Sequence, residues 1–321
     1  MTVNVLIAFL LDLVIGDPAI KAHPVRLIGG LLGLFERFLY PMKRKFIGGL
    51  LLVIFSLCSV GAVMLGLWYG MSFFTLPLSI NVVLVILLFF LFCNRDMIRE
   101  AKKIHAYLLQ GRLDEARRQV GRIVGRDTGN IVSRDIIRAT VESVAENVVD
   151  GFTAPLFYLL IGGLPLAYVY KTVNTIDSRF GYRNQRYESF GKAGARLDDI
   201  LGFVPARLNA ALSLCATLFN RDVYRTVRRH GRSHPSPNSG IAEAVFSGYL
   251  GIALGGPSHY GGQEKEKPWI GENRIADKEL DDPALILRAV GLYWRIVSFT
   301  LVVGLLAFSL LDLPLVFGLR G

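Results

Sequence analysis

Long runs of uncharged, apolar residues alternate with polar segments along the chain. Residues 46–70 form an uncharged run of 25, which at about 1.5 Å per residue is long enough to cross a hydrocarbon core of about 30 Å. Residues 76–93 follow after a short uncharged connection, and residues 296–317 form a third run that only Asp312 interrupts. With the opening run, residues 1–16, they predict four transmembrane helices. The opening run is also compatible with a signal peptide, but it lacks a basic start and a small-residue cleavage site.

Two further apolar blocks are weaker. Residues 152–170 are interrupted by glycines and prolines, and residues 200–219 contain Arg207. If both blocks cross the membrane, residues 171–199 with six Lys or Arg face outward, against the positive-inside rule. If both are broken or re-entrant, that segment stays inside, and broken helices are tolerated where they line a protein cavity. We prefer the second interpretation, which predicts an all-α integral membrane protein with about four clear transmembrane helices and two broken or re-entrant segments.

Charge orients these elements. Residues 17–45 and the segment after Cys93 are rich in Lys and Arg, whereas residues 70–75 carry no charge, so both basic segments should be cytoplasmic. Residues 95–123 carry apolar side chains at helical spacing on both sides of Gly111, which predicts a cytoplasmic helical hairpin with further loops. Acidic residues interleave with its basic ones, which favours a collar near anionic lipid over nucleic-acid binding.

This order of elements suggests four segments. They are residues 1–93, the N-terminal membrane helices and first cytoplasmic loop; 94–151, a cytoplasmic helical segment that ends in an acidic helix; 152–288, the broken membrane segments and polar loops; and 289–321, a C-terminal transmembrane helix. Residues 263–288 receive no assigned role.

Composition supports a membrane protein. A length of 321 residues would suggest two soluble domains, but 52% apolar residues, 19% charged residues and a mean hydropathy of +0.42 argue against them. The net charge is +10. The three cysteines all lie in apolar runs, which predicts buried small side chains and neither a metal site nor a disulfide scaffold.

An amphipathic helix is predicted from Ser133, as its N-cap, to about residue 150. Its apolar positions are Ile137, Val141, Val144 and Val148, and its polar side carries Asp135, Arg138, Glu142, Glu146 and Asp150. Acidic stripes are often only solvated surface, but this one runs directly into a broken apolar block. We therefore expect Glu146, Asn147 and Asp150 to face a cavity at the membrane interface, where oxygen ligands suit Mg²⁺ bound together with substrate phosphates.

A second polar group lies between the two weak apolar blocks. It contains Asn174, Thr175, Asp177, Ser178, Gly181, Tyr182, Lys192, Arg196, Asp198 and Asp199, with Arg207 beyond Pro205. Such a loop is costly to bury unless its groups pair or bind a ligand, so a functional role is expected. Lys192 and Arg196 are candidates for binding phosphate, and the aspartates are candidate metal ligands or bases. The chain has no G-x-x-x-x-G-K-[ST] motif, which excludes a P-loop.

Eight short motifs, in the same order, resemble the adenosylcobinamide-phosphate synthase (CobD/CbiB) family of cobalamin biosynthesis. They are G-D-P and H-P-V within residues 16–25, R-D-T at 126–128, E-S-V-A-E-N-V-V-D-G at 142–151, N-T-I-D-S at 174–178, F-G-K at 190–192, R-L-D-D at 196–199, P-A-R at 205–207 and H-P-S-P-N-S-G at 234–240. The resemblance spans about residues 10–262.

The resemblance implies a multi-pass enzyme of the prokaryotic inner membrane with its active site on the cytoplasmic side. Such an enzyme joins adenosylcobyric acid, a cobalt-containing corrinoid, to (R)-1-amino-2-propanol or its O-phosphate, with ATP cleaved and Mg²⁺ required. The product is adenosylcobinamide or its phosphate. Implied partners are the lipid bilayer, other late cobalamin-pathway membrane enzymes and a second copy of the chain, with no nucleic acid.

The resemblance also implies roles for individual residues. Candidate catalytic residues are Glu142, Glu146, Asp150 and Asp177, of which Glu146, Asp150 and Asp177 are candidate metal ligands. Candidates for binding substrate or ATP are Asp17, His23, Arg126, Asp127, Asn147, Asn174, Ser178, Lys192, Arg196, Asp198, Asp199, Arg207, His234 and Asn238.

The alternative is a non-catalytic membrane sensor or transporter on the same scaffold. Relatives that signal are thought to have lost the acidic motifs, whereas this chain retains them. A transporter would need polar residues in the middle of its spans, yet residues 46–70 contain no charge and residues 76–93 offer only Asn81. Both features favour the enzyme.

Overall fold

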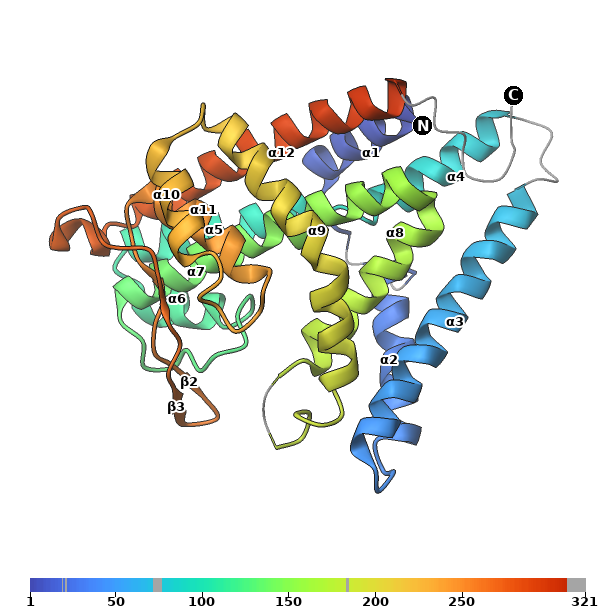
Figure 1. Ribbon diagram of the computed structural model, residues 1–321, viewed down its shortest axis with the longest axis horizontal. Coiled ribbons are helices and arrows are strands. Elements are labelled where there is room, and N and C mark those ends of the chain that lie inside the picture. Colours follow the sequence, from blue (N-terminus) through green and yellow to red (C-terminus); the bar gives the residue numbers. More distant parts are fainter. Residues whose placement is uncertain (19, 21, 72–76, 183–184, 311–321) are drawn as a thin grey trace. The chain divides into compact units, whose positions relative to one another are not determined.

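The computed structural model describes residues 1–18, 20, 22–71, 77–182 and 185–310, and it is almost entirely helical (Figure 1). Contacts divide the chain into two compact units. The first contains Met1–Cys93, Ala154–Leu201 and Val302–Gly321, and the second contains Asn94–Thr153 and Gly202–Leu301. Each unit therefore builds its own core from segments that are far apart in the sequence.

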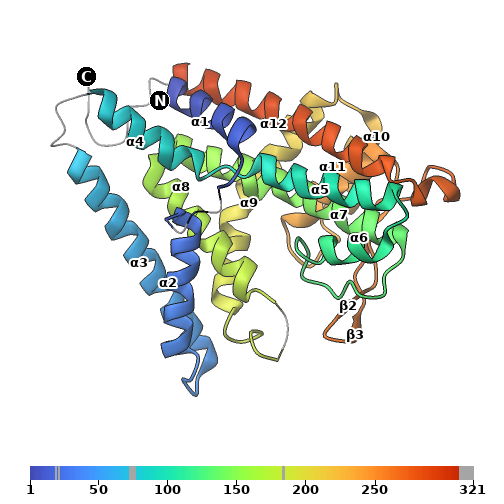
Figure 2. The ribbon, with the colours of Figure 1, turned by 180° about the vertical axis from the view of Figure 1, so that it is seen from behind.

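The first unit is a group of apolar helices. It consists of α1 (Thr2–Ile15), α2 (Pro24–Leu39), α3 (Lys45–Met71), α4 (Pro77–Phe89), α8 (Ala154–Phe180), the start of α9 (Lys192–Ala216) and the end of α12 (Ala284–Leu310). α1 packs on α4, and α3 packs on α2 and α8, as Figure 2 shows. α3 has no polar side, and its exposed residues include Phe55, Val63 and Leu65. Apolar side chains on the outside of a helix are typical of a helix that faces lipid.

Five helical stretches of the described chain are long and apolar enough to cross a membrane. They are Lys45–Leu67, Ile80–Leu109, Ser133–Phe180, Lys192–Ala216 and Ala284–Leu310, and α1 is a shorter apolar helix of 14 residues. The chain is therefore an all-α, multi-pass membrane protein, as its apolar runs predicted. The end of the third predicted run, residues 311–317 with Asp312, lies outside the described residues.

The predicted break in residues 152–170 occurs at two glycines within α8. Gly162 has φ −139° and Gly163 has φ +65°, so both leave the helical conformation. The positive φ of Gly163 lies in the left-handed region, which a residue without a Cβ adopts at little cost. Pro165 follows this kink. Because the kink already interrupts the helical hydrogen bonds there, the missing N–H of the proline costs no further bond.

The second weak block differs from the expectation, because α9 runs as one helix through Pro205. A proline inside a helix leaves the carbonyl four residues earlier without its donor, here that of Leu201. The hydroxyl of Tyr158 on α8 donates to the Leu201 carbonyl at 2.7 Å and replaces the missing bond. The sequence of the block alone could not show this donor, since Tyr158 lies more than forty residues earlier.

The second unit surrounds helix α7 (Ser133–Val148), most of whose apolar residues are fully buried. Its other elements are α5 (Asn94–Leu109), α6 (Leu113–Val120), the π-helical turn Val149–Thr153, α10 (Arg221–His230), α11 (Ser239–Leu250), the 3₁₀ turn Asp277–Asp281 and most of α12. α7 packs on α5, α6 and α11, and α10 packs on α11. α5 and α6, joined at Gly111, confirm the predicted helical hairpin.

Two small antiparallel sheets follow α11. β1 (Leu254–Gly255) pairs with β4 (Trp269–Ile270), with Leu254 opposite Ile270. β2 (Ser258–Tyr260) pairs with β3 (Gln263–Lys265) through a turn at Gly261 and Gly262. Strands β3 and β4 lie within residues 263–288, to which the sequence assigned no role.

Two local expectations are corrected. Ser133 is the first residue of α7, and Val132 precedes it as the N-cap. Asn174 to Ser178, expected in a loop, lie in the last turns of α8, and the residues from Lys192 to Asp199 lie in the first turns of α9. The hydroxyls of Thr175 and Ser178 donate to carbonyls four residues earlier, which satisfies these polar groups inside a helix.

Tyr158→Phe should destabilise the protein because it leaves the Leu201 carbonyl without a donor. The expected cost is about 1–3 kcal/mol in the free energy of unfolding, measured by thermal unfolding in detergent. Pro205→Ala supplies a backbone N–H at the same place, so the cost of Tyr158→Phe should shrink in that background. Tyr182→Phe, at an exposed side chain, is the control. Equal costs of Tyr158→Phe in the unmodified chain and in the Pro205→Ala background would contradict this explanation.

Candidate functional site

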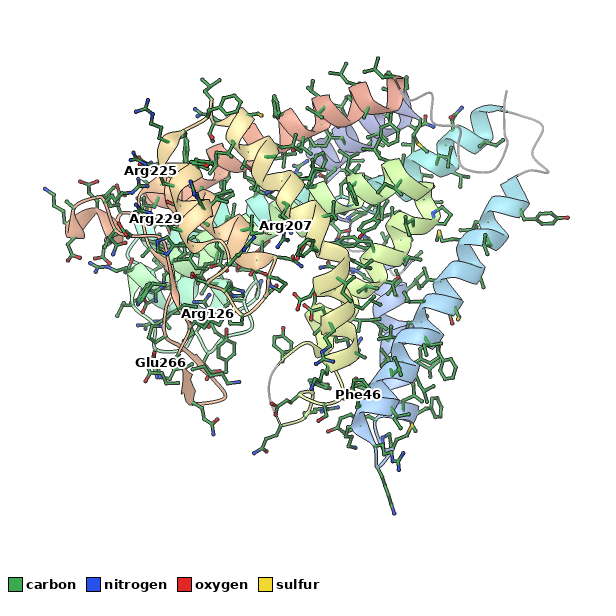
Figure 3. The ribbon with its side chains drawn as sticks, in the orientation of Figure 1. Phe46, Arg126, Arg207, Arg225, Arg229 and Glu266 are labelled. Atoms are coloured by element: carbon green, nitrogen blue, oxygen red, sulfur yellow. The ribbon has the colours of Figure 1, made fainter. Side chains whose placement is uncertain are left out.

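The second unit buries a group of charged side chains around the C-terminal half of α7. Glu142, with only 5% of its surface exposed, accepts a hydrogen bond from the Gly255 N–H at 2.7 Å and forms an ion pair with Arg126. Arg126, labelled in Figure 3, also donates to Ser258 Oγ at 3.3 Å. The pair therefore joins α7 to strands β1 and β2, and each charge is neutralised by the other.

Glu146 lies one turn after Glu142 on α7, and Asp150 lies in the π-helical turn that follows. The negative charges of Asp150 and Glu142 act on Glu146, as do the positive charges of Lys267 and Arg126. Turns of π-helix are rare and often occur at functional sites. This one displaces Asp150 from the regular helical stripe that the sequence predicted.

A fourth carboxylate, Glu243 of α11, joins this group and was not among the predicted residues. It is 3% exposed, and its Oε2 has no hydrogen-bond partner in the described part of the chain. Burial raises the pKa of Glu243 well above its usual value, and the charges of Glu142 and Glu146 raise it further. His234 Nε2 lies 3.9 Å from Glu243 Oε1. The sequence did carry a sign of this residue, since a lone glutamate in a small apolar helix must be buried at a cost.

A polar contact links α7 to α5 and α12. The Tyr293 hydroxyl of α12 donates to Asn94 Oδ1 of α5 at 2.7 Å and lies 3.2 Å from Asn147 Oδ1 of α7. Asn94 and Tyr293 are fully buried, and neither was predicted. Their sequence neighbourhoods give no sign of a shared site, because they are about two hundred residues apart.

Asp127 holds the β2–β3 hairpin. Its Oδ2 accepts from the Gly262 N–H at 2.7 Å, and its own N–H donates to the His259 carbonyl at 2.8 Å. Lys267, which follows this hairpin, acts electrostatically on both Glu146 and Glu243. The R-D-T motif thus attaches a lysine-bearing segment beside the buried carboxylates.

The remaining predicted residues of the second unit meet beside α9. Arg207 donates to the Phe203 carbonyl at 2.8 Å and lies 3.4 Å from Asn238 Oδ1. His234 Nδ1 accepts from the Ser236 N–H at 3.0 Å, which fixes the turn before α11. The H-P-S-P-N-S-G motif therefore orients both Asn238 and the imidazole that faces Glu243.

In the first unit, Asp17 and His23 form a close pair. His23 Nε2 lies 2.6 Å from Asp17 Oδ1, and His23 Nδ1 accepts from the Val25 N–H at 3.1 Å, which caps α2. Both imidazole nitrogens are therefore engaged, and the ring stands edge-on to Phe90. In this conformation the pair stabilises the start of α2.

The other predicted residues of this unit lie at the adjoining ends of α8 and α9. Asn174, Asp177 and Ser178 belong to α8, and Lys192, Arg196, Asp198 and Asp199 belong to α9. Lys192 and Arg196 are exposed and one turn apart, which leaves both cations open to solvent. Asp177 therefore belongs to the first unit, while Glu146 and Asp150 belong to the second, and a metal site shared by the three stays a prediction.

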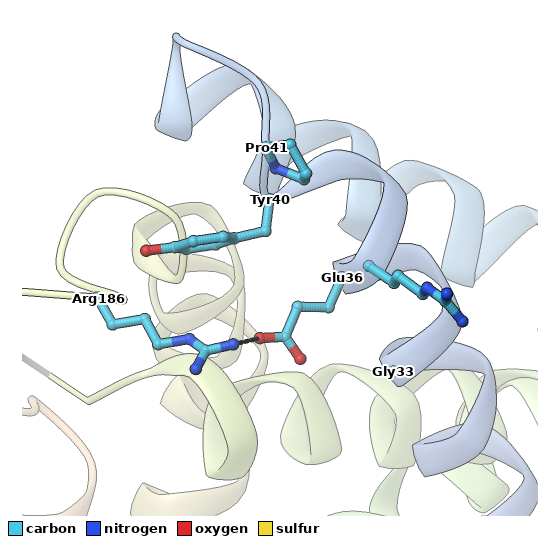
Figure 4. Close-up of a pocket in the computed structure, with 6 residues that line it drawn as sticks. Gly33, Glu36, Tyr40, Pro41 and Arg186 are labelled. Carbon is cyan, nitrogen blue, oxygen red and sulfur yellow. Dashed lines mark hydrogen bonds and ion pairs between the residues drawn. The ribbon is translucent and has the colours of Figure 1, made fainter.

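A hollow of about 270 Å³ lies at the end of α2, lined by Gly33, Glu36, Arg37, Tyr40, Pro41 and Arg186. Figure 4 shows the Arg186 guanidinium directed at the Glu36 carboxylate, at 2.8 Å. Glu36 also accepts from the Tyr187 hydroxyl at 2.7 Å. These bonds attach the loop between α8 and α9 to α2, so the hollow is part of that attachment.

The described residues contain no group of three or more His, Cys, Asp or Glu side chains placed to hold a metal ion. The described residues are therefore compatible with Mg²⁺ only if one or two carboxylates share the ion with substrate phosphates. Mg²⁺ is usually bound in this way. Of the predicted carboxylates in the second unit, Glu142 is held by Arg126 and the Gly255 N–H. Glu146 and Asp150 are therefore the candidates for this role.

Comparison with known proteins gives consistent matches over most of the chain. A family model described as "CobD/Cbib protein" matches residues 5–293. A "Cobalamin biosynthesis protein CobD" of Klebsiella pneumoniae is 41% identical, over 92% of this chain and 93% of its own length. A protein of the same name from Clostridium perfringens is 40% identical over 84% and 87%, and a "Cobalamin biosynthesis protein CbiB" of Salmonella arizonae is 39% identical over 90% and 91%. No solved structure matches.

Arg126→Met should strongly destabilise the second unit because it leaves Glu142 buried without its cation. Removing one partner of a buried pair typically costs about 3–5 kcal/mol, which thermal unfolding in detergent would register as a large drop in Tm. Glu142→Gln in the same chain should recover much of the loss. Arg126→Lys, which keeps the charge, is the matched control, and a Tm as high for Arg126→Met as for the control would refute the pairing.

The pH dependence of stability should report on Glu243. The unfolded carboxyl has a pKa of about 4.3, and burial raises the folded value above it. The protonated form therefore contributes its full stability below about pH 4, and this contribution is lost as the pH rises through the folded pKa. Glu243→Gln cannot lose a proton, so as the pH rises above about 4.3 the Tm of the unmodified protein should fall relative to that of the variant. Parallel Tm profiles would contradict this.

Proposed function

Because the chain belongs to the CobD/CbiB protein family, we propose that it acts in cobalamin biosynthesis as a membrane-bound, ATP-dependent amide ligase. Its substrates would be adenosylcobyric acid and (R)-1-amino-2-propanol or its O-phosphate, and its product adenosylcobinamide or its phosphate. The curated relatives carry names of cobalamin biosynthesis proteins, which supports the pathway. The eight motifs support the reaction.

The observation that carries this proposal is the gathering of Glu142, Glu146 and Glu243 in the second unit, with one carboxylate oxygen buried and unpartnered. Burying several carboxylates together is costly, and it is typical of sites whose ligands supply the missing positive charge or proton. A scaffold without a ligand would gain nothing from this arrangement.

The proposed reaction has two steps. An oxygen of the corrinoid carboxylate attacks the γ-phosphorus of ATP, so a C–O–P bond forms, the bond to the β-phosphate oxygen breaks and ADP leaves. The amine nitrogen then attacks the acyl carbon, an amide bond forms and inorganic phosphate leaves. The amine loses its extra proton to a base before this attack. The first step depends mainly on positioning and on neutralising phosphate charge.

The residues of the second unit suit these two requirements. Glu146 and Asp150 would hold Mg²⁺, which supplies positive charge to the nucleotide phosphates when bound. Lys267 would add a cation from the segment after the hairpin. Glu243, whose raised pKa favours the protonated carboxyl, is the candidate for exchanging a proton with the amine. Arg126 would hold Glu142 in place, so that Glu142 positions α7 against β1.

Motif residues of α9 would supply further cations. Lys192 and Arg196 are exposed, and with Arg207 they are candidates to bind phosphates or the propionates of the corrinoid. The location of the active site on the cytoplasmic side of a prokaryotic inner membrane belongs to this proposal. Association with other late cobalamin-pathway enzymes and formation of a homo-oligomer are also part of this proposal.

Glu146→Gln should abolish amide formation while it leaves the fold intact. The loss expected for removing such a group is about 10²- to 10⁴-fold in rate. The assay is purified protein in detergent with adenosylcobyric acid, ATP, Mg²⁺ and the amine, with the product separated by chromatography and identified by mass. Glu115→Gln, at a surface acid of α6, is the matched control and should keep full activity.

Parallel assays with aminopropanol and with its O-phosphate would identify the amine substrate. Normal turnover by Glu146→Gln would remove this residue from the chemistry. Absence of product from the unmodified protein with either amine, while its Tm stays normal, would refute the ligase.

A further inference from the structure

The outward side of α12 carries a hollow that is separate from the buried carboxylates. Its volume is about 410 Å³, and Tyr249, Arg288, Gly291, Leu292 and Arg295 line it. Arg288 and Arg295 are seven residues apart, about two helical turns, and therefore share one face of α12. Arg295 donates to the Tyr249 hydroxyl at 2.8 Å, so the end of α11 closes one side of the hollow.

Both arginines are exposed, and neither forms an ion pair with a carboxylate anywhere in the described chain. In this respect they differ from Arg112, Arg117, Arg134 and Arg138 of the same unit, each of which contacts an acidic side chain. Two unpaired guanidiniums that line one hollow favour an anion between them. The planar fork of a guanidinium matches two oxygens of a phosphate group.

The position of the hollow along α12 indicates a source for the phosphate group. From Ile296 to Leu310 the helix has no charged residue, and Val302 and Leu306 are exposed apolar side chains. Val302 follows Arg295 by seven residues, so helical spacing places it on the same face. Arginine and tyrosine at the end of an apolar span are typical of the boundary between water and lipid.

The opposite side of α12 contacts α5 and α7. Tyr293 is fully buried and donates to Asn94, whereas Gly291 and Arg295 on either side of it are exposed. α12 therefore separates the hollow from the buried carboxylates, and a ligand in the hollow would not compete with a ligand at α7.

We propose that this hollow binds a phosphate group, supplied by the headgroup of an anionic phospholipid or by free phosphate. Arg288 and Arg295 donate to its oxygens, and the absence of a side chain at Gly291 leaves the room for it. The Tyr249 hydroxyl orients Arg295. The proposal is independent of the ligase assignment.

The test uses the full chain, purified and delipidated in detergent. Phosphatidylglycerol is added and its retention measured by native mass spectrometry, with diacylglycerol as a lipid that lacks phosphate and inorganic phosphate measured by equilibrium dialysis. Arg288→Gln with Arg295→Gln should weaken binding of the phosphate-bearing probe at least about tenfold. Gly291→Leu keeps both arginines but fills the hollow, and nothing lies within 4 Å of an added Cβ there. It should weaken binding to a similar extent.

Arg221→Gln with Arg228→Gln is the matched control. It removes the same charge from two exposed arginines that are also seven residues apart, on α10, and it should leave binding unchanged. Retention of phosphatidylglycerol without binding of inorganic phosphate identifies a lipid headgroup, and binding of phosphate that displaces the lipid identifies the free anion. Binding that survives Gly291→Leu, that is equal for diacylglycerol, or that falls as much in the control would overturn the proposal. If the double arginine variant fails to fold, Gly291→Leu decides.

Discussion

The arrangement of the second unit depends on the ion pair between Arg126 and Glu142. Without Arg126, Glu142 would be a buried charge on the central helix, and α7 could not pack on its neighbours at tolerable cost. The other Glu142 oxygen takes the Gly255 N–H, so the same carboxylate fixes strand β1. Beside this pair lie the half-buried Glu146 and the buried Glu243, whose Oε2 has no hydrogen-bond partner in the described part of the chain.

In the first unit the corresponding constraint concerns the backbone. Inside a bilayer every N–H and C=O needs a partner within the protein, because no water is present. The Leu201 carbonyl, deprived of its donor by Pro205, receives the Tyr158 hydroxyl, and α9 continues as a helix. A second constraint in this unit is close packing at Gly49, because a Cβ there would overlap the Phe190 carbonyl oxygen. The phenylalanine of the F-G-K motif thus lies directly against α3.

The family motifs divide between positioning residues and residues whose charge is available to a ligand. Asp127, His23 and His234 accept hydrogen bonds from backbone N–H groups and fix a hairpin, the start of a helix and a turn. Glu146, Lys192 and Arg196 are among the motif members whose charge is available to a ligand, and Glu243 joins them from outside the motifs. This division explains how one chain keeps many charged residues near a membrane, because a large share of them satisfy one another.

Local patterns in the chain were enough to establish the fold class, most of the apolar spans, the helical hairpin at residues 94–120 and the acidic side of α7, because periodicity and run length depend on neighbouring residues. The break at Gly162 and Gly163 was also predictable from their backbone freedom. Three-dimensional packing was needed for what no local pattern contains: the continuity of α9, the entry of Glu243, Lys267, Asn94 and Tyr293 into the candidate site, and the pairing of Arg126 with Glu142. The physical reason is that a buried polar group is stable only beside its partner, and these partners come from distant parts of the chain.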